Sequence, residues 1–203
     1  RSQDLVIGHD MPRCADVLVT EIVDCGLLGE GLIPTIAHAR KHLVHPEATI
    51  IPQAARVYGV LVESPRIYGL NQASVACGLD VRSFNQFATR GYFPVRLHTY
   101  EHRFLSAPVE VFSFDFTGDP ILPAAQELRI KVTQGGTCHA VAFWFELDVT
   151  ESITLANQPM NTASHWMQAV QCLETELDVC GGQMVRCGAA HEGATIWFTC
   201  PTD

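Results

Sequence analysis

Two glutamates nine residues apart, Glu21 and Glu30, are the side chains of this sequence that are best placed to do chemistry. An apolar, β-branched run over residues 17–20 leads into Glu21, and a glycine-broken turn containing Asp24 leads on to Glu30. In an α/β pattern, strands that end in this way deliver polar side chains to the mouth of a site. Two close carboxylates repel each other unless a cation lies between them. A guanidinium suits that position because it is planar, always charged and able to donate paired hydrogen bonds to a carboxylate.

A structural explanation of the same residues is also open. Glu30 can be an acid near the start of a helix, where the helix dipole favours negative charge. Glu21 can be a solvated residue at the end of a strand. Because strand–turn–helix junctions rich in Gly and Glu are common, the spacing alone favours this structural explanation.

The elements that must hold the two glutamates follow from the apolar pattern and the breakers. Residues 4–7 and 15–23 predict two short strands. Pro34 then opens a helical stretch over residues 35–44, which has basic residues near its end and a proline just beyond it. The chain therefore begins as an α/β unit, and we place the end of that unit near residue 48.

The rest of the chain consists of short β segments separated by Gly, Pro, Asn and Asp. This spacing predicts a mostly β fold, an antiparallel barrel or sandwich. The expected strands cover residues 50–63, 79–84, 94–98, 109–116, 127–133, 139–149, 168–173, 184–188 and 195–199.

Residues 64–94 are the least periodic stretch and carry several aromatic side chains among polar residues. A long excursion of this kind between strands is either a contact arm or a loop packed on its own domain. The sequence leaves both explanations open. The aromatic residues are Tyr68, Phe84, Phe87, Tyr92 and Phe93.

Composition excludes several classes of protein. With 203 residues, 47% of them hydrophobic, the chain can bury a proper core. A net charge of −9 argues against nucleic-acid binding, which needs clustered Lys and Arg, and suits a basic substrate. No apolar run approaches the roughly 18 residues of a membrane-spanning helix.

The cysteines point to a reducing compartment. There are eight of them, mostly beside apolar residues, and no two form a Cys-x-x-Cys pair. This indicates reduced, buried thiols. The first residues carry no apolar segment of a signal peptide. We therefore expect an intracellular protein, cytoplasmic or nuclear, with no membrane association.

A second candidate group, Ser164, His165 and Trp166, opens a β segment after a polar loop. Trp166 could form the aromatic wall of a pocket, with His165 as a positioned donor. Alternatively, the tryptophan plugs the end of the barrel and the histidine is its hydrogen-bonded neighbour. Taken alone, the group favours the structural explanation.

Other chemistries find less support. His38, His42 and His45 fall at helical spacing, but no Cys or carboxylate joins them at a ligand-like distance, so we expect surface histidines rather than a zinc site. No Gly-x-Ser-x-Gly elbow, Gly-x-Gly-x-x-Gly loop or P-loop is present. A cupin-like metal-binding barrel is kept as an alternative.

Taken together, these motifs resemble the protein arginine methyltransferases, most closely the divergent tandem-module members seven and nine. Residues 19–31, VTEIVDCGLLGEG, are similar to the double-glutamate loop of that family, and residues 51–64 are similar to its first barrel strands. Residues 164–166 resemble its Thr-His-Trp loop, with serine in place of threonine. The resemblance covers roughly residues 11–198.

The resemblance implies a Rossmann-like domain that binds S-adenosylmethionine and a β-barrel that closes the other side of the cleft. Glu21 and Glu30 would clamp the guanidinium of a protein arginine and orient one nitrogen for in-line attack on the sulfonium methyl. Asp24, Ser164 and the His165–Trp166 pair would bind the substrate and shape its pocket. A second copy of the chain, or a tandem module, would be the partner.

The family also implies what this sequence does not contain. Its glycine-rich cofactor loop and acidic ribose ligand precede the double-glutamate loop, and neither is present here. We therefore interpret residues 1–47 as the last part of the cofactor domain and residues 48–203 as the barrel, with residues 64–94 as a possible dimerisation arm. We expect a C-terminal fragment that neither binds S-adenosylmethionine tightly nor is active alone. A non-catalytic β-barrel interaction module is the alternative.

Overall fold

The first described part of the chain forms a strand–helix–strand unit. The computed structural model describes residues 15–200, so the strand expected over residues 4–7 lies outside the described residues. The helix that follows the first strand was predicted, whereas the strand after it begins at Val44 and not near residue 50 as expected; the two strands are parallel, and the boundary expected near residue 48 falls inside the second one. The elements are β1 (Ala15–Val19), α1 (Leu32–His42) and β2 (Val44–Ile51).

The helix α1 is tied to the rest of the molecule by its apolar face and by one arginine. Leu32, Ile36 and Ala39 recur at helical spacing and are buried. Basic residues fill the last turn, where the helix dipole favours positive charge. One of them, Arg40, donates hydrogen bonds to the carbonyl oxygens of Thr117 (2.9 Å) and Gly118 (2.5 Å). The strand–helix–strand unit is therefore fixed to the connection between two strands of the β region.

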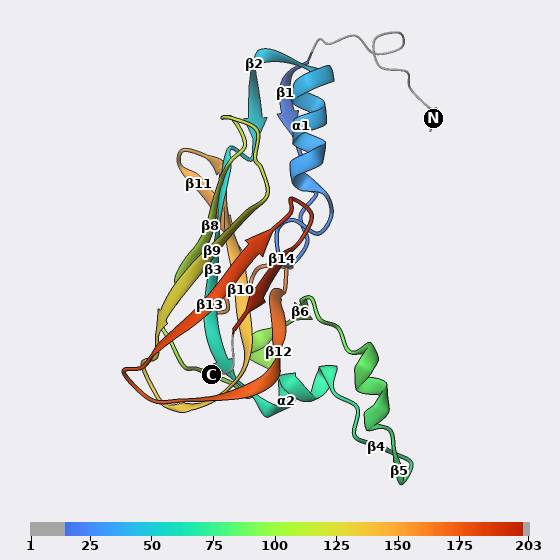
Figure 1. Ribbon diagram of the computed structural model, residues 1–203. Helices are drawn as coiled ribbons and strands as arrows, with labels where there is room; N and C mark the ends of the chain where they lie inside the picture. The colour runs from blue at the N-terminus through green and yellow to red at the C-terminus, as the bar shows by residue number, and fades with distance from the viewer. Residues whose placement is uncertain (1–14, 201–203) are drawn as a thin grey trace.

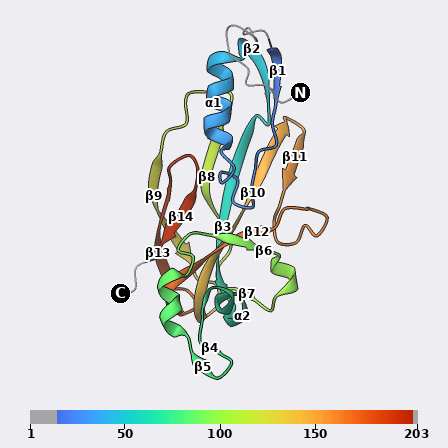
Figure 2. The same cartoon turned by 90° about the vertical axis from the view of Figure 1, so that its right-hand side faces the viewer.

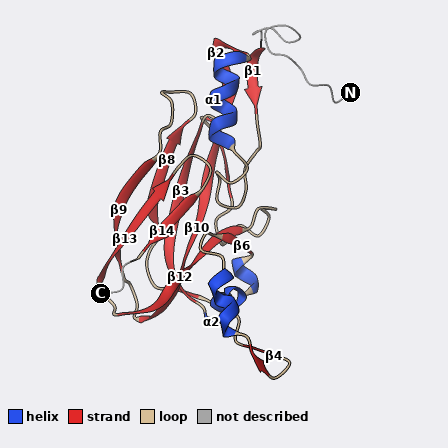
Figure 3. Ribbon diagram, turned by 45° about the vertical axis from the view of Figure 1, so that its right-hand side comes forward, coloured by secondary structure: helices blue, strands red, loops and turns tan. Residues whose placement is uncertain are grey.

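A seven-stranded sheet forms the middle of the molecule (Figures 1 and 3). Its order is β6–β12–β10–β3–β7, with β11 added to β10 and β8 added to β3, and the paired strands are antiparallel. Its strands are β3 (Ala54–Glu63), β6 (Phe93–Val95), β7 (Arg103–Phe104), β8 (Val109–Asp115), β10 (Gly136–Thr150), β11 (Ile153–Ala156) and β12 (Gln168–Val179).

A second sheet of three antiparallel strands packs against the first. Its strands are β9 (Ala124–Lys131), β13 (Met184–His191) and β14 (Ile196–Thr199). Side chains from both sheets, among them Ile130, Phe143, Ile196 and Phe198, form one apolar core. Two facing antiparallel sheets confirm the predicted β-dominated fold.

Side-chain amides bridge the edges where the two sheets meet. Among the described residues, no backbone ladder joins β12 to β14 or β8 to β9. Instead, the Gln171 amide accepts from the backbone N–H of Phe198 and donates to its carbonyl oxygen, at 2.8 Å each. Gln126 donates to the carbonyl oxygen of Val111 in the same manner. The barrel is therefore open, and glutamines hold its seams.

The central strand β10 is apolar on both faces because both faces are covered. Phe143 and Phe145 point into the core between the two sheets, whereas Ala142 and Trp144 face a second cluster on the opposite side. That second cluster includes Ile67, which lies in a short helix under the sheet. A continuous apolar run is the expected pattern for a strand buried on both sides.

Residues 69–87 project from the end of the sheets that is remote from α1 (Figures 1 and 2), after a short helix that packs under the sheet through Ile67. The predicted strand over residues 79–84 is replaced by a two-residue hairpin and a 3₁₀ helix. Local side-chain bonds explain this difference, because Asp80 accepts from Arg82 and Asn85 bonds both backbone groups of Ala73. The elements are α2 (Pro65–Tyr68), β4 (Val75–Ala76), β5 (Leu79–Asp80), and the 3₁₀ helices over Gly69–Asn71 and Arg82–Phe87; a third 3₁₀ helix, Leu97–Thr99, follows β6.

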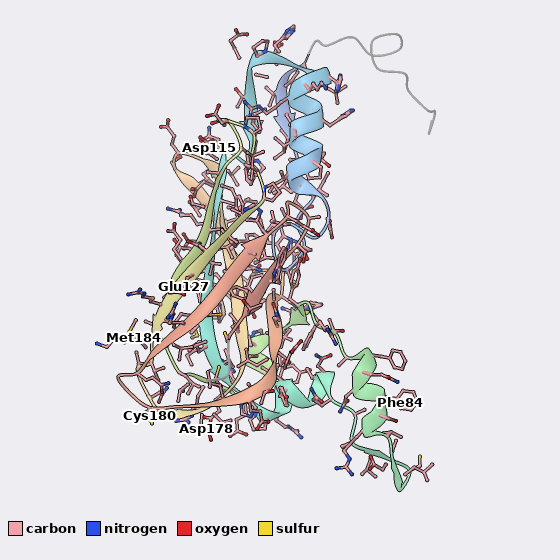
Figure 4. All side chains as sticks on the ribbon, in the orientation of Figure 1. Phe84, Asp115, Glu127, Asp178, Cys180 and Met184 are labelled. Carbon is pink, nitrogen blue, oxygen red and sulfur yellow. The ribbon has the colours of Figure 1, made fainter. Side chains whose placement is uncertain are left out.

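The projecting segment, called the arm below, exposes apolar side chains. Phe84 points away from the sheets at its outer side (Figure 4). Large exposed apolar residues of this kind are uncommon in such density on a free surface and mark interaction sites. They are Leu70, Val75, Leu79, Phe84 and Phe87.

Two further features bear on the class of protein. None of the seven described cysteines forms a disulfide. Within residues 15–200, no helix has the length and the apolar character needed to cross a bilayer.

Candidate active site

The loop that carries the two glutamates, residues 20–31, connects β1 to α1. Its apolar residues Val23, Leu27 and Leu28 are buried, which leaves Glu21 and Glu30 on the exposed side. The backbone of Leu27 has a φ of 81°, in the left-handed region that ordinary residues rarely adopt. Buried leucines therefore hold the loop in a fixed shape while both carboxylates face solvent.

Asp24 organises the loop from within. Its Oδ1 accepts hydrogen bonds from the backbone N–H groups of Gly26 (3.2 Å) and Gly29 (2.9 Å). Its Oδ2 accepts from the hydroxyl of Tyr92 at 2.7 Å. The sequence predicted a substrate contact for Asp24, and that role stays a prediction. The structure gives the carboxylate a structural use, because it fixes the turn that separates the two glutamates.

Two of the three glycines of the loop, Gly26 and Gly29, are needed for close approach. A Cβ on Gly29 would lie 2.3 Å from Asp24 Oδ2, and a Cβ on Gly26 would lie 2.7 Å from the ring of Tyr92. Real Cβ atoms essentially never come this near, so any side chain here would displace the carboxylate or the ring. The glycines that broke the sequence pattern are thus explained by the packing of Asp24 and Tyr92.

The loop over residues 164–166 meets the first glutamate. His165 Nε2 lies 3.8 Å from Glu21 Oε1, and both side chains are largely exposed. Trp166 packs edge-on against Phe145 in the core, with ring centroids 5.4 Å apart, and its other neighbour is the His165 ring at 4.2 Å. Trp166 is thus partly a core residue, as the structural explanation held, while His165 faces the glutamate. The fold brings together two motifs that are more than 140 residues apart in the chain.

Asn157, which sequence reasoning missed, connects these two loops. It is fully buried, and its Nδ2 donates to the carbonyl oxygens of Cys25 (3.1 Å) and Met167 (2.7 Å). Its Oδ1 accepts from the backbone N–H of Phe145 at 2.8 Å. Only one orientation of the amide satisfies all three partners, since two are acceptors and one is a donor. Asn157 therefore fixes the glutamate loop and the 164–166 loop to the same strand.

Two buried hydroxyls flank the contact between Glu21 and His165. Thr20 Oγ1 immediately precedes the glutamate and Ser164 Oγ immediately precedes the histidine. Within the described residues neither atom has a hydrogen-bond partner. Buried polar atoms are nearly always hydrogen-bonded, so these two hydroxyls are exceptions beside the contact of the two loops.

Burial controls the ionisation of two other groups in the loop. Burial, reinforced by the neighbouring Asp24 carboxylate, raises the pKa of the Cys25 thiol to about 12. Burial and the hydrogen bond to Asp24 raise the pKa of Tyr92 well above its usual range. Both groups are therefore neutral at physiological pH, and the negative charge of the loop resides on its carboxylates.

The described residues do not hold the parts that S-adenosylmethionine requires. The turn after β1 is the described connection from a parallel strand to a helix; it carries exposed acidic residues, and its glycines Gly26 and Gly29 are covered by Tyr92 and Asp24 instead of forming an open cradle. The loop presents two exposed carboxylates, Glu21 and Glu30, and such groups are suited to binding a cation.

A metal site finds no support in the described part of the chain. His38 and His42 lie side by side on α1, with ring centroids 4.9 Å apart. However, residues 15–200 contain no group of three or more His, Cys, Asp or Glu side chains arranged to hold an ion.

Comparison with known proteins identifies the family of the chain. Residues 53–197 match the family model described as the arginine methyltransferase oligomerization subdomain. An arginine N(omega)-methyltransferase of Streptomyces achromogenes subsp. streptozoticus is 47% identical over 175 residues, which cover 86% of this chain and 48% of that protein. Protein arginine N-methyltransferase 7 of Oryza sativa subsp. indica is 35% identical over 228 residues, which cover 98% of this chain and 32% of the relative. The chain thus spans about half the length of the first relative and about a third of the second.

A solved structure shares the fold. The Trypanosoma brucei PRMT1 enzyme–prozyme heterotetrameric complex with AdoHcy superposes with a TM-score of 0.74 at 18% sequence identity. The match covers 86% of this chain and 57% of that one. At this level of identity the likeness concerns the fold alone.

Proposed function

The chain belongs to the arginine methyltransferase oligomerization subdomain family, and we propose that it forms the acceptor side of a protein arginine methyltransferase active site. The observation that carries this proposal is the contact of His165 with Glu21, at 3.8 Å, on a loop that presents Glu30 nine residues later. Exposed carboxylates on a rigid turn are suited to binding the guanidinium of a protein arginine.

The proposed chemistry is positioning and electrostatics. Glu21 and Glu30 accept hydrogen bonds from the guanidinium and orient one nitrogen toward the methyl donor. Their negative charge also draws positive charge away from that nitrogen, which makes its lone pair more available. His165 and Trp166 border the position of the guanidinium, and the unpartnered hydroxyl of Ser164 offers a further hydrogen bond.

The methyl group would come from S-adenosylmethionine, whose sulfonium makes that methyl electrophilic. Because the described residues lack a cradle for this cofactor, we expect this chain alone to bind it weakly and to transfer no methyl groups.

Two valines, Val17 and Val19, are exposed on β1 of the two-stranded parallel sheet. Parallel sheets are normally covered on both faces, so the face that carries these two valines is suited to burial by a further element of a cofactor domain.

We further propose that the arm binds a second copy of the chain or a related module. The support is the set of exposed apolar side chains on the arm, together with a family model described as an oligomerization subdomain. The same surface favours the second candidate function, a non-catalytic interaction module. The two candidates differ in one respect, since only the first requires the glutamates.

The test measures methyl transfer to an Arg–Gly-rich peptide by this chain joined to the remaining part of the Streptomyces methyltransferase. Glu21→Gln and Glu30→Gln should each lower the rate by about 10²-fold or more, a size typical of losing one preorganised electrostatic contact. Glu47→Gln, at an exposed acid on β2, is the matched control and should leave the rate unchanged.

Two outcomes contradict the proposal. One is full activity of both glutamine variants, which would leave the clamp without a role. The other is a folded wild-type fusion that binds S-adenosylmethionine yet transfers no methyl group, which would favour the interaction module.

A further inference from the structure

Two cysteines lie opposite each other at the end of the β13–β14 hairpin. Cys187 is a residue of β13, and Cys200 directly follows β14. The antiparallel register pairs Gly188 with Thr199. One further step along this register places Cys187 directly opposite Cys200.

The hydrogen bonds of Gln171 determine whether Cys187 and Cys200 form a hydrogen-bonded or a non-hydrogen-bonded antiparallel pair. The backbone N–H and carbonyl of Phe198 both bond the Gln171 side chain on β12, so they point away from β13. The pair Ala189–Phe198 is therefore of the non-hydrogen-bonded type. Pair types alternate along an antiparallel ladder, so Cys187 and Cys200, two residues further on, form another non-hydrogen-bonded pair.

That pair type has the spacing of a cross-strand disulfide. Opposite Cα atoms in it are about 4.5 Å apart, within the range of roughly 4.4–6.8 Å that disulfides span. Cys187 and Cys200 share the strand face of Ala189 and Phe198, which are both buried. The proximity of Cys187 also contributes to raising the pKa of Cys200 above its usual range.

We propose that Cys187 and Cys200 form a reversible cross-strand disulfide on oxidation, which locks the end of β14 to β13. This inference does not depend on the proposed methyltransferase function. The proposed disulfide would make a redox modification site of two reduced thiols that the strand register places opposite each other.

The reaction is thiol–disulfide exchange with a small disulfide such as oxidised glutathione. One cysteine thiolate attacks a glutathione sulfur, breaks the glutathione S–S bond and releases one reduced glutathione. The second cysteine thiolate then attacks the protein sulfur of the mixed disulfide and releases the other. Two electrons pass from the protein to glutathione, and the two thiol protons end on the two released glutathione molecules.

The surroundings determine how the reagent reaches the pair. Cys187 is fully buried, but Cys200 is partly exposed. Both residues line a cavity of about 980 Å³ between the β12–β14 region and the base of the arm. The hydrogen bond with Cys187, together with burial, raises the pKa of Cys200 well above its usual range, so the thiolate is scarce at neutral pH. Oxidation should therefore be slow at pH 7 and faster as the pH rises toward 9.

The experiment treats the folded chain with oxidised glutathione at pH 8.5 and maps its thiols by mass spectrometry. Cleavage at Arg186 yields one peptide that contains both cysteines, and a second cleavage after Glu192 separates them unless a disulfide joins them. The background variant Cys77→Ser/Cys180→Ser removes two exposed thiols; Cys180 lies at the β12–β13 turn (Figure 4).

We expect a linked pair of peptides that have lost two hydrogen atoms, and reduction should separate them. Cys200→Ser should abolish the link, while Cys138→Ser, at a neighbouring buried thiol, should leave it intact. The disulfide closes a short loop and should therefore raise the thermal unfolding midpoint by several degrees. The proposal is overturned if the two peptides separate without reductant, if Cys200 stops at a glutathione adduct, or if it pairs with Cys138. The wild-type map gives this answer even if a serine variant fails to fold.

Discussion

Removal of the side-chain amide of Asn157 should lower the free energy of unfolding by a large amount for the few atoms removed. Asn157→Ala removes one acceptor and two donors and leaves three backbone groups, those of Phe145, Met167 and Cys25, without their partner. An unsatisfied buried N–H or C=O costs about 1–3 kcal/mol. The Phe145 N–H bears most of this cost because its bond is buried, whereas the bonds to the Cys25 and Met167 carbonyls are only partly buried. The variant should therefore lose roughly 2–4 kcal/mol of unfolding free energy.

Urea unfolding of the folded chain measures this loss. With an m-value of about 2 kcal/mol per molar, the urea midpoint should fall by roughly 1–2 M. The matched control is Asn161→Ala, in the same loop, where the lost bonds to Ala156 (2.7 Å) and Ala163 (3.3 Å) lie near the surface and are replaced by water. That control should shift the midpoint by a few tenths of a molar at most.

A second substitution at the same position, Asn157→Asp, should make the stability of the chain fall as the pH rises. Asn157→Asp keeps the acceptor for Phe145 but turns a carboxylate toward two carbonyl oxygens in a buried site. Burial and these oxygens must raise the pKa of the new carboxyl above its value of about 3.9 in the unfolded chain. An acid with a raised folded pKa is most stable below its unfolded pKa and loses stability as the pH rises through the folded pKa. Asn157→Asp should thus approach the wild type near pH 4 and fall well below it at pH 7. Equal midpoints for Asn157→Ala and Asn161→Ala, or a flat pH profile for the aspartate variant, would refute the reasoning.

Three further predictions concern the glutamate loop. Tyr92→Phe keeps the ring but removes the 2.7 Å hydrogen bond to Asp24, so it should lower the unfolding free energy in urea titrations by about 1–3 kcal/mol. The control is Tyr100→Phe, at another partly buried tyrosine. Equal losses in the two variants would contradict a role for the Tyr92 hydroxyl. Gly29→Ala should lower the thermal unfolding midpoint of the chain, because the new Cβ would lie 2.3 Å from Asp24 Oδ2. Gly69→Ala places no atom within 4 Å of the new Cβ, so it should leave the midpoint unchanged or raise it. Cys25, whose pKa burial raises to about 12, should resist alkylation by iodoacetamide at pH 8 while Cys77 and Cys180 react, and equal labelling rates would count against its burial.

The glutamate loop was predictable because its signals are local. A β-branched run, a glycine-rich turn and a helix punctuated by Pro34 follow one another, and each follows from backbone preferences over a few residues. The β segments were predictable for the same reason, since alternation and turn residues are read one strand at a time. The predicted strand over residues 79–84 was wrong because short side-chain bonds of Asp80 outweighed β propensity there.

Asn157 could not be predicted, because none of its partners is near in sequence except through the fold. A buried asparagine in a polar loop looks like a turn residue until Cys25 and Met167 are brought beside it. Tyr92 was one aromatic among several between strands, and its hydroxyl acquires meaning only through Asp24. The single available signal was the density of Asn, Gln and Gly near the motifs, and that density does not indicate which residue bonds which.

These contacts show which residues hold the two loops of the site together and which do not. The Glu21–His165 contact, at 3.8 Å between largely exposed groups, is screened by water and contributes little to stability. It therefore cannot be what holds the two loops together. The buried bonds of Asn157 and Asp24 do so, and they leave the exposed carboxylates without structural duty. It follows that Glu21 and Glu30 can be replaced by glutamine with little loss of stability. A loss of activity in those variants would then report on chemistry at the site and not on unfolding.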